Sequence, residues 1–134
     1  MLQVGNVVKY AGYKWYVIGI TEKKVTLLSK KNFGGHKFDE KSNDYKNSEI
    51  RAYLNSTILR SIEDAGGNPL PVKLSDVICT DKVWLLSVKE AEKLPLKIRK
   101  IVCFWWWLRS PSKYYRLTAA SVNLGGSVNT DQCR

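Results

Sequence analysis

The chain has 134 residues, 44% of them hydrophobic and 25% charged, and its formal net charge is +10 at pH 7. This composition excludes a disordered tail and fits one globular domain, residues 1–134, with a single hydrophobic core. No run of about 18 apolar residues suggests a membrane span, and the first residues lack the basic and apolar parts of a signal peptide, so we expect a cytoplasmic or particle-associated protein.

Residues 1–30 predict an antiparallel meander. Segments 5–10, 14–21 and 25–30 are rich in Val, Ile, Tyr and Trp, and Gly12 lies in the turn between the first two. Aromatic and β-branched residues favour strands, and a glycine between two such segments favours a hairpin. Segment 31–47 is rich in Gly, Asn, Lys, Asp and Ser without a regular period, which indicates a surface connection.

A helix that covers this sheet is predicted to begin after Ser48, whose hydroxyl can cap the first turn. Apolar residues then recur at helical spacing: Ile50, Tyr53, Leu54, Ile58 and Ile62. Asn55 and Ser56 weaken the helix midway, and the pair Gly66 and Gly67 ends it.

Shorter elements are predicted between this helix and the C-terminal third. Segments 72–74 and 77–79 are apolar and fit short strands or turns. Segment 83–86 is also apolar and predicts a buried strand. Ser87 followed three residues later by Glu90 forms a capping box, which predicts a second, short helix over residues 88–93.

Three adjacent tryptophans, residues 105–107, open the C-terminal third and lead into Leu108, Arg109, Ser110 and Pro111. Because neighbouring side chains of a strand point to opposite faces, three consecutive rings cannot share one core face. We therefore expect the tryptophans to be scaffold packed on different layers, with a loop beginning at the proline, which lacks an N–H.

A β-hairpin is predicted beyond that loop, because small or apolar residues alternate with polar ones around Gly125 and Gly126. One predicted face carries Ala120, Val122, Val128 and Thr130. The opposite face, expected to face outward and to continue the loop, carries Ser121, Asn123, Ser127, Asn129 and Asp131.

The block Trp-Trp-Leu-Arg-Ser-Pro at 106–111 is followed, after the loop, by a second group: Ala119, Ala120, Val122, Gly126 and Val128. Upstream segments occur in a matching order: 5–10, 15–18, 27–29, 50–55 and 83–87. Together these residues resemble C-type lectin-fold proteins, in particular the variable proteins of diversity-generating retroelements and their bacterial, archaeal and phage relatives. The resemblance implies an α+β, C-type lectin-like fold with antiparallel sheets, two helices and much irregular loop structure.

The C-terminal end departs from that family. Its members usually continue into a Gly-Val-Arg-Pro-Ala-like final strand, whereas this chain ends at Arg134. An antiparallel sheet without its last strand has an unpaired edge. We therefore expect residues 132–134, or a partner chain, to lie against the N-terminal strand.

The resemblance implies a ligand-binding protein with a diversified C-terminal surface, which binds another protein or a surface glycan without a cofactor. In the family, reverse transcription randomises adenines, so some codons vary while those of Trp, Lys and Gln stay fixed. The residues of this chain that such a process can reach are Tyr114, Tyr115, Arg116, Leu117, Ser121, Asn123, Leu124, Ser127, Asn129 and Asp131. Tyrosines with small polar residues are also the composition of a paratope.

Enzyme chemistry has little support. His36 is the only histidine and lies among Gly, Asn and Lys, and the three cysteines Cys79, Cys103 and Cys133 are far apart. No nucleophile elbow, zinc-ligand spacing or phosphate-binding glycine motif occurs. We therefore expect no enzyme activity, no metal site and no cofactor, and a solvated imidazole at His36.

Two other functions stay open. The net charge of +10 favours anionic partners, so a nucleic-acid-binding module could use Lys113, Arg116 and the tyrosines of loop 112–117 for phosphate contact and base stacking. A purely structural component of a phage or cell surface, without a dedicated ligand, is the third option.

Overall fold

The computed structural model describes residues 1–30, 33, 36–39, 42–100, 106–111, 119–122 and 127–129. Over these residues the fold is α+β, with three small antiparallel sheets, one 16-residue helix, short helices and much irregular chain. Within the described parts, no helix is both long enough and apolar enough to cross a membrane.

The N-terminal sheet is the predicted meander. Its strands are β1 (Val7–Tyr10), β2 (Tyr13–Ile20) and β3 (Val25–Ser29), paired antiparallel in that order. The β1–β2 turn has two residues with positive φ, Ala11 at 51° and Gly12 at 78°, as a type I′ hairpin turn requires. The local signals of residues 1–30 were therefore sufficient to predict this sheet.

The predicted long helix consists of α1 (Glu49–Tyr53), a π-helical turn (Leu54–Ile58) and α2 (Leu59–Asp64). Ser48 caps it as expected, since its hydroxyl accepts the Arg51 N–H at 3.2 Å. The helix ends at Gly66, which has φ of 95°, and the N–H of Gly67 donates to Ile62 O at 2.8 Å. This is the hydrogen-bond pattern of a Schellman motif, so the predicted stop is confirmed.

The π-helical turn suits the spacing of the apolar residues. Ile50, Leu54, Ile58 and Ile62 follow one another at intervals of four, whereas an α-helix overshoots by about 40° for each step of four residues. A π turn is wider, so it takes up part of this rotation between Leu54 and Ile58. Ile50, Ile58 and Ile62 are consequently all buried.

The middle of the chain holds only short elements. These are a 3₁₀ turn (Tyr45–Asn47), β4 (Val72–Lys73), β5 (Thr80–Asp81), α3 (Val88–Glu92) and α4 (Leu96–Arg99). The capping box of α3 is confirmed, with both Ser87 and Glu90 making their reciprocal hydrogen bonds. The prediction of a strand at 83–86 is wrong, because this segment pairs in no sheet, and α4 was not predicted.

The C-terminal sheet contains β6 (Trp106–Pro111), β7 (Ala119–Val122) and β8 (Val128–Asn129), in that order and antiparallel. Its register aligns Trp107 with Ser121 and Asn129, and Trp106 with Val122 and Val128. The predicted hairpin is therefore confirmed, and so is the shared face of Val122 and Val128, which the structure places opposite each other.

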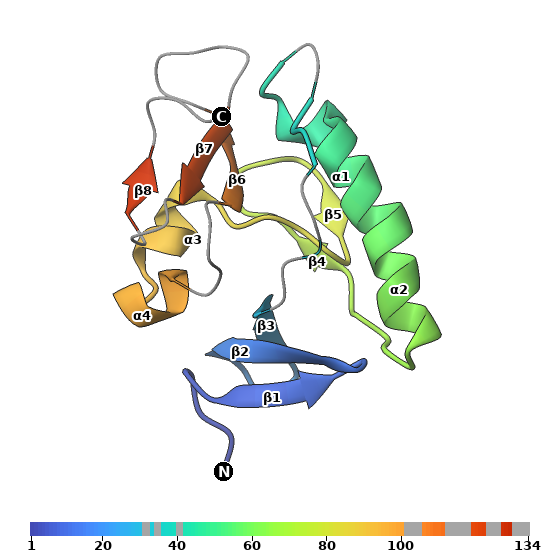
Figure 1. The fold of residues 1–134 in the computed structure, drawn as a ribbon, viewed down its shortest axis with the longest axis vertical. Coiled ribbons are helices and arrows are strands. Elements are labelled where there is room, and N and C mark those ends of the chain that lie inside the picture. The colour runs from blue at the N-terminus through green and yellow to red at the C-terminus, as the bar shows by residue number, and fades with distance from the viewer. Residues whose placement is uncertain are drawn as a thin grey trace.

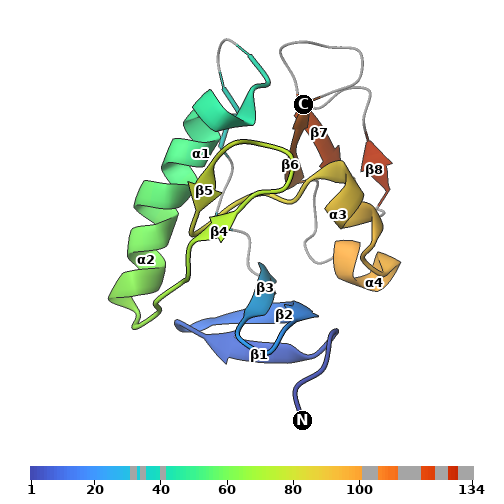
Figure 2. The ribbon, with the colours of Figure 1, turned by 180° about the vertical axis from the view of Figure 1, so that it is seen from behind.

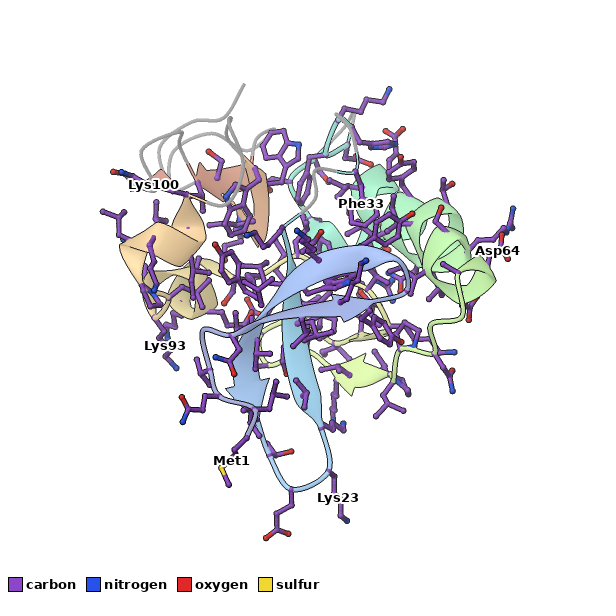
Figure 3. The ribbon with its side chains drawn as sticks, turned by 60° about the horizontal axis from the view of Figure 1, so that its bottom comes forward. Met1, Lys23, Phe33, Asp64, Lys93 and Lys100 are labelled. Atoms are coloured by element: carbon purple, nitrogen blue, oxygen red, sulfur yellow. The ribbon has the colours of Figure 1, made fainter. Side chains whose placement is uncertain are left out.

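Two views show how these elements are arranged. In Figure 1 the sheet β1–β3 lies at one end of the molecule and β6–β8 at the other, with α1 and α2 along one side and α3 and α4 on the opposite side. Figure 2 shows the same arrangement from behind, with β4 and β5 near the centre. Figure 3 looks onto the β1–β3 end, where Lys23 marks the tip of the β2–β3 turn.

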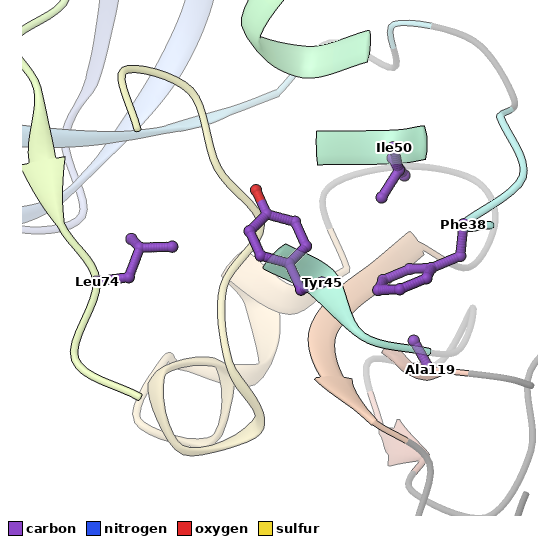
Figure 4. Packing of buried hydrophobic residues seen from close by; sticks show 5 residues of the cluster. All are labelled: Phe38, Tyr45, Ile50, Leu74 and Ala119. Carbon is purple, nitrogen blue, oxygen red and sulfur yellow. The ribbon is translucent and has the colours of Figure 1, made fainter. Parts of the chain in front are cut away.

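The core consists of three clusters of buried residues. The first joins Phe38, Tyr45, Ile50, Leu74 and Ala119 (Figure 4). The second joins Leu86, Ala91, Leu108 and Val122, and the third joins Trp15, Ile58 and Ile62. The first cluster corrects the prediction for 31–47, because Phe38 and Tyr45 are each only 2% exposed within what was expected to be a surface connection.

Candidate functional site

Strand β6 begins with two tryptophans that pack on different clusters. Trp107 packs on the first cluster, edge-on to Phe38 at 5.6 Å between ring centroids, and its indole N–H donates to His36 O at 2.9 Å. Trp106 packs on the second cluster, and its N–H donates to Arg99 O at 3.3 Å. The expected packing on different layers is confirmed for these two rings, while Trp105 lies outside the described residues.

Arg109 lies in the middle of β6 and is only 1% exposed. Its guanidinium Nε donates to Asp76 Oδ1 at 2.8 Å, and Nη1 donates to Leu85 O at 2.8 Å and to Glu90 Oε1 at 2.6 Å. Nη2 lies 2.7 Å from Asp76 Oδ1 as an ion-pair contact without hydrogen-bond alignment. Because a buried charge requires such partners, Arg109 ties β6 to the 76–90 region.

The charge of Arg109 is retained despite its burial. Burial alone opposes the charged form, but the hydrogen bonds with Glu90 and Asp76 outweigh this effect and raise the pKa of Arg109. The next residue, Ser110, accepts the N–H of Val88 at 2.9 Å and so satisfies a donor in the first turn of α3. The Leu-Arg-Ser part of the 106–111 block is therefore a structural clamp.

A second buried charge joins the long helix to β5. Asp81 is 3% exposed. Its Oδ1 accepts two hydrogen bonds from Arg51, one from Nε at 3.0 Å and one from Nη2 at 2.8 Å. Tyr45 adds a hydroxyl at 3.3 Å from Oδ2. Burial, followed by the negative charge of Asp81, raises the pKa of Tyr45, whereas the hydrogen bond with Asp81 raises the pKa of Arg51. The Cys79 thiol nearby has a pKa raised by burial and then by Asp81.

Asn55, in the π-helical turn, fixes the chain that follows Asp81. Its Nδ2 donates to Arg51 O at 3.1 Å and Val83 O at 2.8 Å, and its Oδ1 accepts the N–H groups of Lys82 at 3.1 Å and Val83 at 3.2 Å. Asn55 thus supplies the hydrogen-bond partners of both backbone groups of Val83, so these groups are not available to a neighbouring strand.

His36 belongs to neither of the two charge clusters. His36 is not a freely solvated imidazole as expected, because its ring stacks on Tyr53 with centroids 4.2 Å apart. Its Nδ1 lies 2.6 Å from Lys37 O. Among the residues that the structure describes, no group of three or more His, Cys, Asp or Glu side chains could hold a metal ion.

The sequence-predicted binding residues are described only in part. Seven of them lie outside the described residues: Tyr114, Tyr115, Arg116, Leu117, Asn123, Leu124 and Asp131. Ser127 is exposed, and Asn129 lies on β8 with a side chain that is not described. Residues 132–134, which we expected against the N-terminal strand, also lie outside the described residues.

Ser121 requires a correction. We expected it on the outward face of the hairpin, but it is 2% exposed. By register it shares a face of the sheet with Trp107, and that face packs on the cluster around Phe38 and Tyr45. The opposite face, with Trp106, Val122 and Val128, packs on the second cluster, so β7 is covered on both sides.

The ends of the two C-terminal connections are also fixed. Pro111 pairs with Ala119 at one end of β7, and Val122 pairs with Val128 at the other end. The described residues that flank connections 112–118 and 123–127 therefore lie at opposite ends of the four-residue strand β7, which spans roughly 13 Å.

Sequence reasoning did not single out the residues that hold the scaffold together. Arg51, Asp81 and Arg109 are all charged residues beside apolar ones. Arg51 follows Ile50, Asp81 comes soon after segment 77–79, and Arg109 follows the tryptophan run. Such an interruption is the signal that could have found them, because a charge in a buried strand needs a partner from elsewhere in the chain. Comparison with models of protein families, with curated proteins and with solved structures finds no match to this chain.

Proposed function

We propose that this chain is a ligand-binding protein with a C-type lectin-like fold, and that its binding surface consists of loop 112–117 and the connections of the C-terminal hairpin. The ligand is a protein or a surface glycan, and binding requires no cofactor. Ser127, which is exposed, belongs to this surface. Ser121 does not, because its side chain is buried.

The observation that supports this proposal most is the burial of Arg109 in the 106–111 block. The most specific part of the resemblance is engaged with Asp76, Leu85 and Glu90 and is unavailable to a partner. A second part, segment 50–55, is engaged in the same way through Arg51 and Asn55. A scaffold held by such contacts allows the segments that follow it to change sequence without loss of the fold.

The chemistry of the proposed surface also favours recognition of a macromolecule. Its residues are Tyr114, Tyr115, Arg116, Leu117, Asn123, Leu124, Ser127, Asn129 and Asp131. Tyr and Arg are the side chains that most often dominate binding energy, and Ser and Asn adapt their hydrogen bonds to different partners. The leucines that the proposal includes in this surface suit a diversified site better than a face selected only for solubility.

A pair of display libraries tests the proposal without knowledge of the natural ligand. In one library codons 114–117 are randomised, and in the matched control codons 107–110 are randomised. Most members of the first library should resist proteolysis and some should bind unrelated target proteins, whereas most members of the control should be degraded. Equal loss of folded protein from both libraries would show that loop 112–117 belongs to the core.

The diversification itself is tested in the DNA next to the gene. We expect a reverse-transcriptase gene and a near-identical repeat of the 3′ coding region that differs from it at adenine positions. Codons 105–107, which encode Trp, should be identical in the two copies. Absence of such a repeat would reject diversification in the present genome but leave the binding proposal to the library test.

Nucleic acid is the second candidate partner, and the net charge of +10 favours it. Fluorescence anisotropy with a single-stranded oligonucleotide can separate the two candidates. A steep loss of affinity with rising salt, together with loss of binding in a Lys113→Gln, Arg116→Gln variant, would identify nucleic acid as the partner. If parent and variant bind the oligonucleotide equally weakly, nucleic acid is rejected as the partner, and a protein or glycan remains the proposed ligand.

A further inference from the structure

A cavity of about 640 Å³ lies between β3, the long helix and the segments 68–72 and 82–86. Small-molecule sites have volumes of roughly 300–1,000 Å³, so this cavity has the size of a ligand site. Its described lining includes no residue of the proposed C-terminal binding surface. Among the described residues, the cavity and that surface are therefore separate.

The lining is mainly apolar and incompletely covered. Strand β3 has the sequence Val-Thr-Leu-Leu-Ser, yet none of its residues is buried. Leu27 and Leu28, on its two faces, both line the cavity, and so do the half-buried rings of Trp84 and Trp106. Each square ångström of apolar surface left in contact with water costs about 25 cal/mol, so an apolar ligand gains free energy by covering these residues.

The charged side chains among the described residues of the lining have one sign. Lys24 and Lys82 are the charged ones, and none of the described lining residues is Asp or Glu. Neither lysine forms an ion pair with a carboxylate in the part of the chain that the structure describes. An unpaired ammonium group beside an apolar surface attracts an anion more strongly than it would in bulk water. The cavity therefore favours a ligand with a negative end.

The exposed members of the lining mark where the cavity meets solvent. Val25 is 44% exposed and Leu70 is 52% exposed, and Lys24 next to Val25 is exposed as well. Lys82, in contrast, is half-buried. Lys24 therefore belongs to the exposed part of the lining, and Lys82 to a more covered part.

We propose that this cavity binds a long-chain carboxylate. The hydrocarbon chain lies against Leu27, Leu28 and Trp84, and the carboxylate pairs with Lys24 or Lys82. The apolar wall disfavours a sugar or a nucleotide, whose polar groups would lose their hydrogen bonds to water, and the two lysines disfavour a cation.

The test is a titration of the purified full chain with three probes that share one tail: laurate, lauryl alcohol and laurylamine, each below its micelle concentration. Indole fluorescence reports binding, since Trp15, Trp84, Trp106 and Trp107 line the cavity. Laurate should bind with one molecule per chain, shift the emission and raise the midpoint of thermal unfolding. Lauryl alcohol should bind more weakly and laurylamine weakest.

Variants assign the binding to the cavity. Changing Lys24 and Lys82 to Gln should lower the affinity for laurate by about fivefold for each lysine. The affinity for lauryl alcohol should stay unchanged. Lys9→Gln, an exposed lysine on β1 outside the lining, is the matched control and should change nothing. Val25→Trp should obstruct the solvent-exposed side of the cavity and lower the affinity for all three probes.

Three results would overturn the proposal. One is the absence of saturable binding. Another is equal affinity for the three probes, which would show that the lysines do not select an anion. The third is an equal effect of Lys9→Gln and Lys82→Gln on laurate, which would show adsorption to a basic protein and not occupancy of the cavity.

Discussion

Nη1 of Arg109 lies 2.6 Å from Oε1 of Glu90, and the same carboxylate oxygen accepts the N–H of Ser87 at 2.9 Å. A single oxygen thus connects strand β6 to the N-terminal cap of α3. Ser87 and Glu90 could be recognised as a capping box from their spacing, but the arginine that shares the carboxylate is 19 residues away. The cap is therefore part of the tertiary structure as well as of the helix.

The first prediction concerns this contact. Arg109→Met should lower the free energy of unfolding by about 3 kcal/mol or more, because one partner of a buried ion pair is removed. Arg109→Lys should also destabilise, since an ammonium group cannot reach Asp76, Leu85 and Glu90 together. Urea unfolding gives the values, with Lys89→Gln on the exposed side of α3 as the control. Unchanged unfolding midpoints would show that the clamp contributes nothing.

The second prediction concerns Asn55. Asn55→Asp keeps the size of the side chain but removes the donor to Arg51 O and Val83 O. Arg51 O keeps the N–H of Leu54, so Val83 O is the acceptor that loses its Asn55 partner, at a cost of about 1–3 kcal/mol. Ser56→Ala, on the exposed side of the same turn, is the control and should change stability by about 0.5 kcal/mol at most. Because the carboxylate is repelled by the two carbonyl oxygens, it should also hold the N–H groups of Lys82 and Val83 less well, and their hydrogen exchange should become faster in the aspartate variant and stay slow in the control.

The third prediction is a pH dependence. Because burial raises the pKa of Tyr45 above its ordinary value of about 10, the folded chain holds the phenolic proton to a higher pH than the unfolded chain. This stabilisation is complete below about pH 10 and is lost as the pH rises through the folded-state pKa.

Tyr45→Phe has no phenolic proton to lose. It should cost about 1 kcal/mol at neutral pH, because the hydrogen bond to Asp81 is lost. The difference between parent and variant should then shrink above about pH 10, where the parent loses its stabilisation. Unfolding curves of both proteins across this range measure the effect. Parallel slopes would mean that Tyr45 ionises equally in both states.

The fourth prediction uses the two tryptophans of β6. Trp106→Ala and Trp107→Ala should each cost about 3 kcal/mol, near the lower end for large aromatic residues because both rings are half-buried. The two rings pack on different clusters, so the costs should add in the double variant even though the residues are adjacent in the chain. A clear departure from additivity would show that the two clusters respond as one.

The sequence allowed prediction wherever the signal was local. The meander, the Ser48 cap, the Ser87 box and the glycine stop each depend on residues within a few positions of one another. The burial of Phe38 depends instead on Trp107, which is far away in the chain, and its own neighbours are polar. No local pattern could distinguish it from a surface aromatic residue.

The candidate site was predictable only in outline. Alternation along β7 correctly placed Val122 on the same face as Val128 and Ser121 on the other face. Alternation cannot show what covers a face of the sheet, and the face of Ser121 is covered by the cluster around Phe38 and Tyr45. Ser121 is small enough to lie beside Trp107 on this covered face, so its polarity did not indicate exposure.

The π-helical turn at Leu54–Ile58 makes the long helix tolerant of one kind of deletion. A π-helical turn holds about one more residue than an α-helical turn for nearly the same rotation about the axis. Deleting one residue within the turn would therefore restore α-helical hydrogen bonding and still leave Ile58 and Ile62 directed at Trp15. A deletion or insertion within α2 would instead turn Ile62 by about 100°. Among natural variants of this chain, a single deletion at Ser56 or Thr57 should therefore be tolerated, whereas insertions and deletions between Leu59 and Ile62 should be absent.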